Sequence, residues 1–165
     1  MSEVKVAIIT LSDRAFAGEY DDLSGPEIEK LVSAGLEAKD LNPVFDRILI
    51  PDDGDQLEQQ VIQAQENGMD VLFTTGGTGI GPRDITPDVV IPLLDREIPG
   101  IMEFIRVKHG ERLPSALLSR SVAGTIGDML IYTLPGSVKA VREYTEEILR
   151  SLPHSLLMVK GIDAH

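Results

Sequence analysis

The sequence contains no cysteine. Without cysteine the chain forms neither a disulfide bond nor a thiolate metal site, which fits a reducing compartment. No stretch approaches the roughly 18 consecutive apolar residues of a membrane-spanning helix. The first residues also lack the basic start and the small-residue cleavage site of a signal peptide. These absences predict a cytoplasmic protein that does not partner with a membrane.

Basic residues are scarce, with 15 lysines and arginines against 27 aspartates and glutamates, and the formal net charge is −12. A surface this acidic repels the phosphates of nucleic acids, so the charge balance argues against DNA or RNA as a partner. Binding a nucleotide on such a protein requires local positive potential. Backbone N–H groups, a few arginines or Mg²⁺ can supply that potential.

The order of the elements predicts an α/β fold. Apolar residues make up 42% of the 165 residues, which is ordinary for a globular chain and favours a single domain spanning residues 1–165. Four apolar, β-branched runs alternate with helical patterns, and this alternation predicts a three-layer α/β/α arrangement around a mostly parallel sheet. The predicted strands are Val4–Leu11, Val44–Ile50, Asp70–Thr74 and Met129–Leu134.

Helix boundaries follow from capping residues and glycines. Ser24 and Glu27 form a capping-box pattern for a helix that we expect to end at Gly35. Asp53 or Asp55 can cap a helix that ends at Gly68. The remaining predictions are a helix capped by Thr86 and kinked or shortened by Pro92, a helix from Ile98 with Ile101, Phe104 and Ile105 facing inward, and a helix Val138–Leu152.

Four polar segments follow the predicted strands, at the ends where parallel sheets bind ligands. They are Ser12-Asp13-Arg14, Pro51-Asp52-Asp53, the loop Thr74–Asp88, and Pro135-Gly136-Ser137. We therefore expect one common site. The first segment could instead be a simple turn, and Ser137 could be only the N-cap of the last helix.

The loop Thr74–Asp88 carries glycines at positions 76, 77, 79 and 81. Glycines let the backbone approach a ligand closely and turn several N–H groups toward an anion. The hydroxyls of Thr75 and Thr78 add donors, and Arg83 can supply a forked cation. The loop matches neither the P-loop nor the dinucleotide fingerprint, because Pro82 and Arg83 stand where those motifs need other residues. A tight turn is the plainer alternative, but four glycines exceed its needs, so the pattern favours phosphate binding.

Asp52 and Asp84 are the acidic residues that these loops bring toward the predicted site. A carboxylate beside a phosphate site repels the ligand unless it holds Mg²⁺ or a polar group of the substrate. Each also has a structural alternative, since acids are common at helix starts. Spacing alone does not separate the two interpretations.

Taken together, these residues resemble the molybdopterin adenylyltransferases of molybdenum cofactor biosynthesis, of the MogA and MoaB type, and the related G domains of gephyrin-like proteins. The resemblance covers nearly the whole chain, and its most specific part is Thr74–Gly79 with Arg83–Asp88. It extends through Asp95–Gly100, Leu118–Gly124 and Leu134–Ser137. The fold that it implies is molybdopterin-binding-like.

The resemblance implies an enzyme that transfers the adenylyl group of MgATP to molybdopterin and releases pyrophosphate. Asp52 and Asp84 take the positions of the family's functional carboxylates, so it assigns them catalysis and Mg²⁺ binding. It implies substrate- and nucleotide-binding roles for Ser12, Asp13, Thr75, Gly76, Gly77, Thr78, Gly79, Arg83, Ser119, Gly136 and Ser137.

The implied partners are molybdopterin, ATP, further copies of the chain and a molybdate-inserting enzyme downstream. The family is commonly trimeric, and the segment Ile98–Ile105 has more apolar residues than one amphipathic face needs. A helix buried on two sides within the monomer would explain the same pattern. For the function, the alternatives are a non-catalytic, oligomeric pterin-binding or scaffold protein and another nucleotide- or sugar-phosphate enzyme on the same fold.

Overall fold

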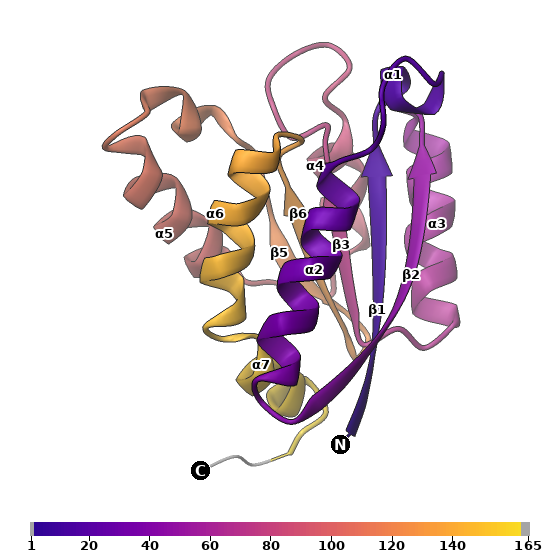
Figure 1. Ribbon diagram of the computed structural model, residues 1–165, viewed down its shortest axis with the longest axis vertical. Helices are drawn as coiled ribbons and strands as arrows, with labels where there is room; N and C mark the ends of the chain where they lie inside the picture. Colours follow the sequence, from indigo (N-terminus) through magenta and orange to yellow (C-terminus); the bar gives the residue numbers. More distant parts are fainter. Residues whose placement is uncertain (1, 163–165) are drawn as a thin grey trace.

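The computed structural model describes residues 2–162, and its centre is a six-stranded sheet (Figure 1). The predicted domain bounds of 1–165 include residue 1 and residues 163–165, which lie outside the described part, and the assignment to a single domain stays a prediction. The strands are β1 (Ser2–Leu11), β2 (Leu41–Ile50), β3 (Val71–Thr75), β4 (Arg96–Glu97), β5 (Ala123–Ile126) and β6 (Met129–Leu134). The helices are α1 (Asp13–Phe16), α2 (Ser24–Glu37), α3 (Gly54–Glu66), α4 (Thr86–Val90), α5 (Pro99–Gly110), α6 (Val138–Leu149) and α7 (Leu152–Val159), with short 3₁₀ helices η1 (Ile91–Leu93) and η2 (Pro114–Leu118).

The strands lie in the order β2-β1-β3-β6-β5-β4. The pairs β1–β2, β1–β3 and β3–β6 are parallel, whereas β5 is antiparallel to both of its neighbours. The prediction of a mostly parallel sheet is therefore confirmed. The chain leaves β1 toward β2 on one side and returns to β3 on the other, so the strand order reverses between β1 and β3. Ligands of such sheets bind at this point, beyond the carboxyl ends of the strands.

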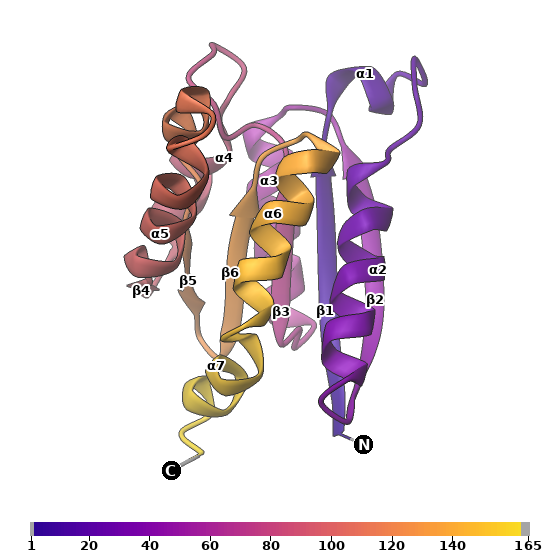
Figure 2. The same cartoon turned by 60° about the vertical axis from the view of Figure 1, so that its left-hand side comes forward.

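Two apolar clusters fill the spaces between the sheet and its helices, because successive side chains of a strand point to opposite faces. On one face Val6, Ile8 and Phe73 pack with residues of α2, α5, α6 and α7. On the other face Ile9 and Leu72 pack with residues of α3 and α4. The three predicted layers are confirmed, and Figure 2 shows α2, α5 and α6 together on one side of the sheet. Within the described residues no helix has both the length and the apolar character that a bilayer crossing requires.

The four predicted strands are confirmed with small shifts at their ends, but β4 and β5 were not predicted. β4 has only two residues and both are exposed, so it carries no apolar pattern. β5 contains Gly124, where a Cβ would collide with the backbone oxygen of Arg96 in the neighbouring strand. β4 is therefore too short to show a strand pattern, and β5 contains a glycine, which is rare in strands, because the neighbouring strand approaches closely.

Two predictions for α2 are wrong. The N-cap is Leu23 rather than Ser24, and the Asp22 carboxylate accepts the hydrogen bond from the N–H of Gly25 at 3.0 Å. The helix also continues past Gly35 to Glu37. A Cβ at Gly35 would lie 2.7 Å from the side chain of Leu149 in α6, so this glycine serves helix packing and does not end the helix.

Three predictions for the later helices are also corrected. The N-cap of α4 is Ile85, because the Thr86 hydroxyl donates to the carbonyl of Gly76 at 2.9 Å instead of capping its own helix. In α5, Ile105 is buried as expected, but the side chain of Phe104 is 51% exposed. The predicted helix Val138–Leu152 is divided into α6 and α7, and Pro153 in the first turn of α7 has no N–H to continue the hydrogen bonds of α6.

We expect Asp53→Ala to lower the free energy of unfolding by about 1 kcal/mol, the usual cost of losing an N-cap. The Asp53 carboxylate caps α3, as one of the sequence alternatives predicted, and accepts from the N–H of Gln56 at 2.9 Å. Urea unfolding of this variant beside Glu58→Ala, on the exposed surface of the same helix, measures the difference. Equal stabilities for both variants would contradict the capping role.

Candidate functional site

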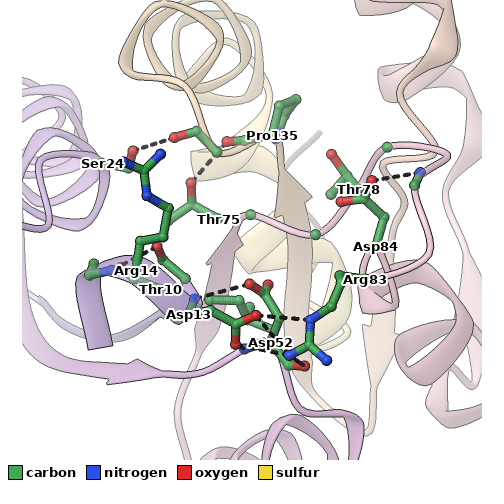
Figure 3. Close-up of a pocket in the computed structure, with 18 of the residues that line it drawn as sticks. Thr10, Asp13, Arg14, Ser24, Asp52, Thr75, Thr78, Arg83, Asp84 and Pro135 are labelled. Carbon is green, nitrogen blue, oxygen red and sulfur yellow. Dashed lines mark hydrogen bonds and ion pairs between the residues drawn. The ribbon is translucent and has the colours of Figure 1, made fainter. Parts of the chain in front are cut away.

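A pocket of about 860 Å³ opens above the carboxyl ends of β1, β3 and β6. This volume lies within the usual range of small-molecule sites, about 300–1,000 Å³. Most of the predicted site residues line it, and Figure 3 shows how several of them face one another. These lining residues are Ser12, Asp13, Asp52, Thr75, Gly76, Gly77, Thr78, Gly79, Arg83, Asp84, Ser119 and Gly136.

Asp13 and Asp52 join the loop after β1 to the loop after β2. The N–H of Asp52 donates to Oδ1 of Asp13 at 2.9 Å, and the N–H of Asp13 donates to Oδ2 of Asp52 at 3.1 Å. Asp52 is therefore not the cap of α3, which is Asp53. The structural alternative for Asp52 as a helix cap is excluded, and its carboxylate lines the pocket instead.

Arg83 extends from the glycine-rich loop to this pair of aspartates (Figure 3). Its Nε and Nη2 atoms donate to the two carboxylate oxygens of Asp13, each at 2.9 Å, and Nη2 also donates to the carbonyl of Asp52 at 3.0 Å. The sequence predicted that this forked cation would bind a ligand. In the structure Asp13 occupies the fork, so Arg83 fastens the loop to the opposite wall of the pocket.

The two aspartates have opposite pKa shifts. The hydrogen bond from the backbone of Asp52, reinforced by Arg83, lowers the pKa of Asp13. Burial raises the pKa of Asp52, and the neighbouring negative charges of Asp13 and Asp84 raise it further against the hydrogen bond from the N–H of Asp13. Asp52 thus carries its charge at a cost that a bound cation would offset.

The glycine-rich loop needs its glycines for two separate reasons. Gly76 and Gly77 have φ values of +103° and +70°, in the region that side chains disfavour. A Cβ at Gly76 would collide with the carbonyl of Leu11, and one at Gly77 would lie 2.5 Å from the hydroxyl oxygen of Thr86. The loop therefore lies directly against β1 and the start of α4, which a side chain at either position would prevent.

Thr86 fixes the direction of the two peptide groups that follow Gly76 and Gly77. Its hydroxyl donates to the carbonyl of Gly76 at 2.9 Å, and its N–H donates to the carbonyl of Gly77 at 3.0 Å. The N–H of a trans peptide points opposite to its carbonyl. The N–H groups of Gly77 and Thr78 therefore point away from Thr86, which makes this segment suited to an anion.

Asp84 lies over the same loop. Its Oδ2 accepts from the N–H of Gly81 at 2.8 Å. A Cβ at Gly79 or Gly81 would lie 2.8 Å or 2.9 Å from that oxygen, so the glycines leave room for the carboxylate. Asp84 does not cap α4, whose N-cap is Ile85 without a side-chain hydrogen bond. It is a carboxylate of the pocket wall.

The segment after β6 closes the pocket beside the glycine-rich loop. Thr75 donates its hydroxyl hydrogen to the carbonyl of Pro135 at 2.8 Å, so this hydroxyl is not the free donor that the sequence predicted. Ser137 accepts from the N–H of Ala140 at 3.2 Å and caps α6. It is absent from the lining formed by the described residues, whereas Gly136 belongs to that lining. Ser119 also lines the pocket, with its Oγ atom 3.0 Å from that of Ser121.

Sequence reasoning missed the residues that tie α2 to the site. Asp22 accepts from the hydroxyl of Thr10 at 2.7 Å, and Ser24 donates to the carbonyl of Gly136 at 2.7 Å. A Cβ at Gly25 would lie 2.5 Å from the carboxylate of Asp22. The available signal was an aspartate two residues before a serine-glycine pair at a predicted helix start.

The pocket is acidic for a phosphate site. Its lining contains five aspartates (residues 13, 21, 22, 52 and 84) and two arginines, Arg14 and Arg83. Both arginines are already paired, with Glu19 and Asp13 respectively. Among the described residues no group of three or more acidic, histidine or cysteine side chains is arranged to hold a metal ion by itself. Mg²⁺ often binds through one or two carboxylates with substrate phosphates and water, which this lining permits.

Comparisons with known proteins identify the family and the fold of the chain. Residues 7–154 match the model of a family described as a probable molybdopterin binding domain. The chain is 35% identical over 163 residues to the molybdopterin adenylyltransferase of Helicobacter pylori strain J99, covering 98% of this chain and 90% of that protein. It is 36% identical to gephyrin of Dictyostelium discoideum, of which it spans only 22%. The crystal structure of the molybdopterin biosynthesis enzyme MoaB from Thermus thermophilus superposes with a TM-score of 0.85 and 39% identity, covering 96% of this chain and 97% of that one.

Proposed function

The chain belongs to the family of probable molybdopterin binding domains, and on that premise we propose that it transfers the adenylyl group of ATP to molybdopterin. The observation that carries this proposal is the glycine-rich loop with Asp52 and Asp84 around one pocket at the point where the strand order reverses. The named activity of the full-length bacterial relatives is molybdopterin adenylyltransferase. The match to them covers 98% of this chain.

The reaction joins a terminal phosphate oxygen of molybdopterin to the α-phosphorus of ATP. The bond between that phosphorus and the bridging oxygen to the β-phosphate breaks, and pyrophosphate leaves with the electron pair. The attacking oxygen is already anionic, so no general base is required. The protein has to align the two phosphates and neutralise the charge that gathers between them.

In this proposal the glycine-rich loop holds the phosphates. The N–H groups of Gly77 and Thr78 point away from Thr86 and are the first donors, and Thr78 contributes its hydroxyl. Ser12, Ser119 and Gly136 line other parts of the pocket and would contact the pterin or its phosphate. Asp13 and Arg83 form a salt bridge with each other, so their charges are already balanced. In this proposal the pair holds the loops together and does not bind the substrate.

Asp52 and Asp84 would hold Mg²⁺. Carboxylate oxygens are the donors that this hard cation prefers, and the excess of acid over base in the lining leaves negative charge for it to balance. Bound there, Mg²⁺ would neutralise the phosphates of ATP and their developing charge. A cation beside Asp52 would also favour its ionised carboxylate and so offset the burial that raises the pKa of Asp52.

Pyrophosphate release tests the proposal. With molybdopterin, ATP and Mg²⁺ together, the protein should release one pyrophosphate for each molybdopterin consumed, and omission of any component should stop the release. Tight binding of molybdopterin without pyrophosphate would instead favour the pterin-binding scaffold. Release of inorganic phosphate would indicate another nucleotide-dependent enzyme on this fold.

We expect the chain to be a homotrimer in solution, with a mass three times its 18.0 kDa. Ile105 and Met102 of α5 belong to the core, but Phe104 and Val107 are 51% and 60% exposed, so part of the surplus apolar surface lies outside the monomer core. Light scattering at micromolar concentration measures the mass. Phe104→Glu should reduce it, whereas Ile62→Glu, at an exposed position on α3, should not. A wild-type mass of 18.0 kDa would contradict the trimer.

A cytoplasmic location and a molybdate-inserting enzyme that accepts the product stay predictions from the sequence. The second is implied by the family resemblance, and it is compatible with the chemistry, since an adenylylated pterin is an activated intermediate for a later reaction.

A further inference from the structure

Arg120 lies between η2 and β5. Its backbone N–H and its guanidinium donate hydrogen bonds to the glycine-rich loop and to the start of α4. Its N–H donates to the carbonyl of Thr78 at 2.8 Å. The guanidinium donates from Nε to the carbonyl of Gly79 at 2.8 Å and from Nη2 to the carbonyl of Asp84 at 2.7 Å. It also pairs with the carboxylate of Asp88 at 2.9 Å and 3.1 Å. One residue thus binds three carbonyls of a single loop.

These bonds set the direction of the next peptide groups of the loop. The carbonyls of Thr78 and Gly79 point toward Arg120, so the N–H groups of Gly79 and Ile80 point away from it. Thr86 imposes the same arrangement on the two preceding peptides. Arg120 and Thr86 together orient four successive N–H groups away from the residues that hold the carbonyls.

Arg120 also fixes the backbone of Asp84. The bond to the Asp84 carbonyl holds one end of the turn, and the bond to the Gly79 carbonyl holds the other. Between them, the Asp84 carboxylate accepts from the N–H of Gly81. Asp88 keeps the guanidinium in place, and this pairing raises the pKa of Arg120 and lowers that of Asp88. The charge of Arg120 is therefore balanced outside the site.

We propose that Arg120 is a positioning residue, which holds the phosphate-binding N–H groups and the Asp84 carboxylate in their working geometry without touching the substrate. It is absent from the pocket lining formed by the described residues, although its neighbour Ser119 belongs to that lining. The part of this proposal that concerns phosphate and Mg²⁺ rests on the proposed function. A lysine would keep the charge, but its single ammonium lacks the planar fork that spans Gly79, Asp84 and Asp88.

Arg120→Lys tests the proposal, with Arg112→Lys as the matched control. Arg112 also pairs its guanidinium with a carboxylate, Glu143, at 2.7 Å, but neither residue lines the pocket. Hydrogen exchange of the backbone amides of residues 78–81 and 83–85 is the first measurement and needs no substrate. The Mg²⁺ concentration that gives half-maximal adenylyl transfer is the second. Arg120→Lys should speed loop exchange and raise this concentration by about 10–100-fold, the usual effect of losing a partner that orients a metal ligand.

The control should leave both measurements unchanged. Loop exchange in Arg120→Lys equal to that of the wild type would overturn the proposal. Faster exchange throughout β1 and β3 would overturn it as well, because Arg120 would then support the whole fold. If the loop alone loosens while the wild type transfers no adenylyl group, the proposed function fails and the positioning of the loop by Arg120 stands.

Discussion

Asp84→Asn is expected to lower kcat for adenylyl transfer on the order of 10²–10³-fold, the range seen when one charge-stabilising group is removed from an active site. The substitution removes the negative charge that faces the pocket but keeps an oxygen for the N–H of Gly81, which the carboxylate binds at 2.8 Å. The fold should therefore survive. Pyrophosphate release gives the rate, and the thermal midpoint reports the stability.

Asp95→Asn is the matched control for this prediction. Asp95 also accepts a hydrogen bond from the N–H of a loop glycine, Gly127, at 2.6 Å, but it does not line the pocket. The control should keep wild-type kcat. If Asp84→Asn turns over as fast as Asp95→Asn, the carboxylate of Asp84 has no part in the chemistry.

Gly77→Ala is expected to lower kcat/KM on the order of 100-fold, since a displacement of about 1 Å in a positioning element has effects of that size. Gly77 has a φ of +70°, and a Cβ there would lie 2.5 Å from the hydroxyl oxygen of Thr86. The loop would have to move away from Thr86, which orients two of its N–H groups. Calorimetric titration with MgATP and steady-state kinetics measure the loss.

Gly68→Ala is the matched control, which separates the displacement of the phosphate-binding loop from the strain of a positive φ. Gly68 has a φ of +69°, but a Cβ there would meet no atom within 4 Å. Both variants should lose about 1–2 kcal/mol of stability through the left-handed conformation. Only Gly77→Ala should also lose ligand affinity. Equal affinity for MgATP in the two variants would refute the role of the loop as a phosphate cradle.

The layered fold could be predicted because β1, β3 and β6 are nearly continuous apolar runs, as expected for strands covered on both faces. The errors lie where tertiary contacts override local signals. Gly35 resembles a helix end but makes room for Leu149 of α6. Thr86 resembles an N-cap, yet its hydroxyl serves the carbonyl of Gly76. No local pattern reveals either contact, because Leu149 lies on another helix and Gly76 lies ten residues before Thr86, across the turn of the loop.

The location of the pocket could also be predicted, since strand ends and glycine spacing are sequence features. The pairing of its charges could not. The sequence assigned Arg83 to a ligand, but Arg83 pairs with Asp13, which precedes it by 70 residues. Arg120 belongs to Leu118–Gly124, one of the segments that carry the family resemblance. Nothing in that segment indicates that the guanidinium binds the carbonyls of Gly79 and Asp84. Such roles depend on which loops the topology brings together.

Tracing the α-phosphate of ATP tests the central claim most directly. The wild-type protein is incubated with molybdopterin, Mg²⁺ and ATP labelled either at the α-phosphate or at the γ-phosphate, and the pterin and pyrophosphate fractions are separated. Adenylyl transfer predicts that the α-label appears on the pterin and the γ-label in pyrophosphate, in equal amounts. A pterin that carries the γ-label, or that stays unlabelled after incubation with α-labelled ATP, would contradict the account.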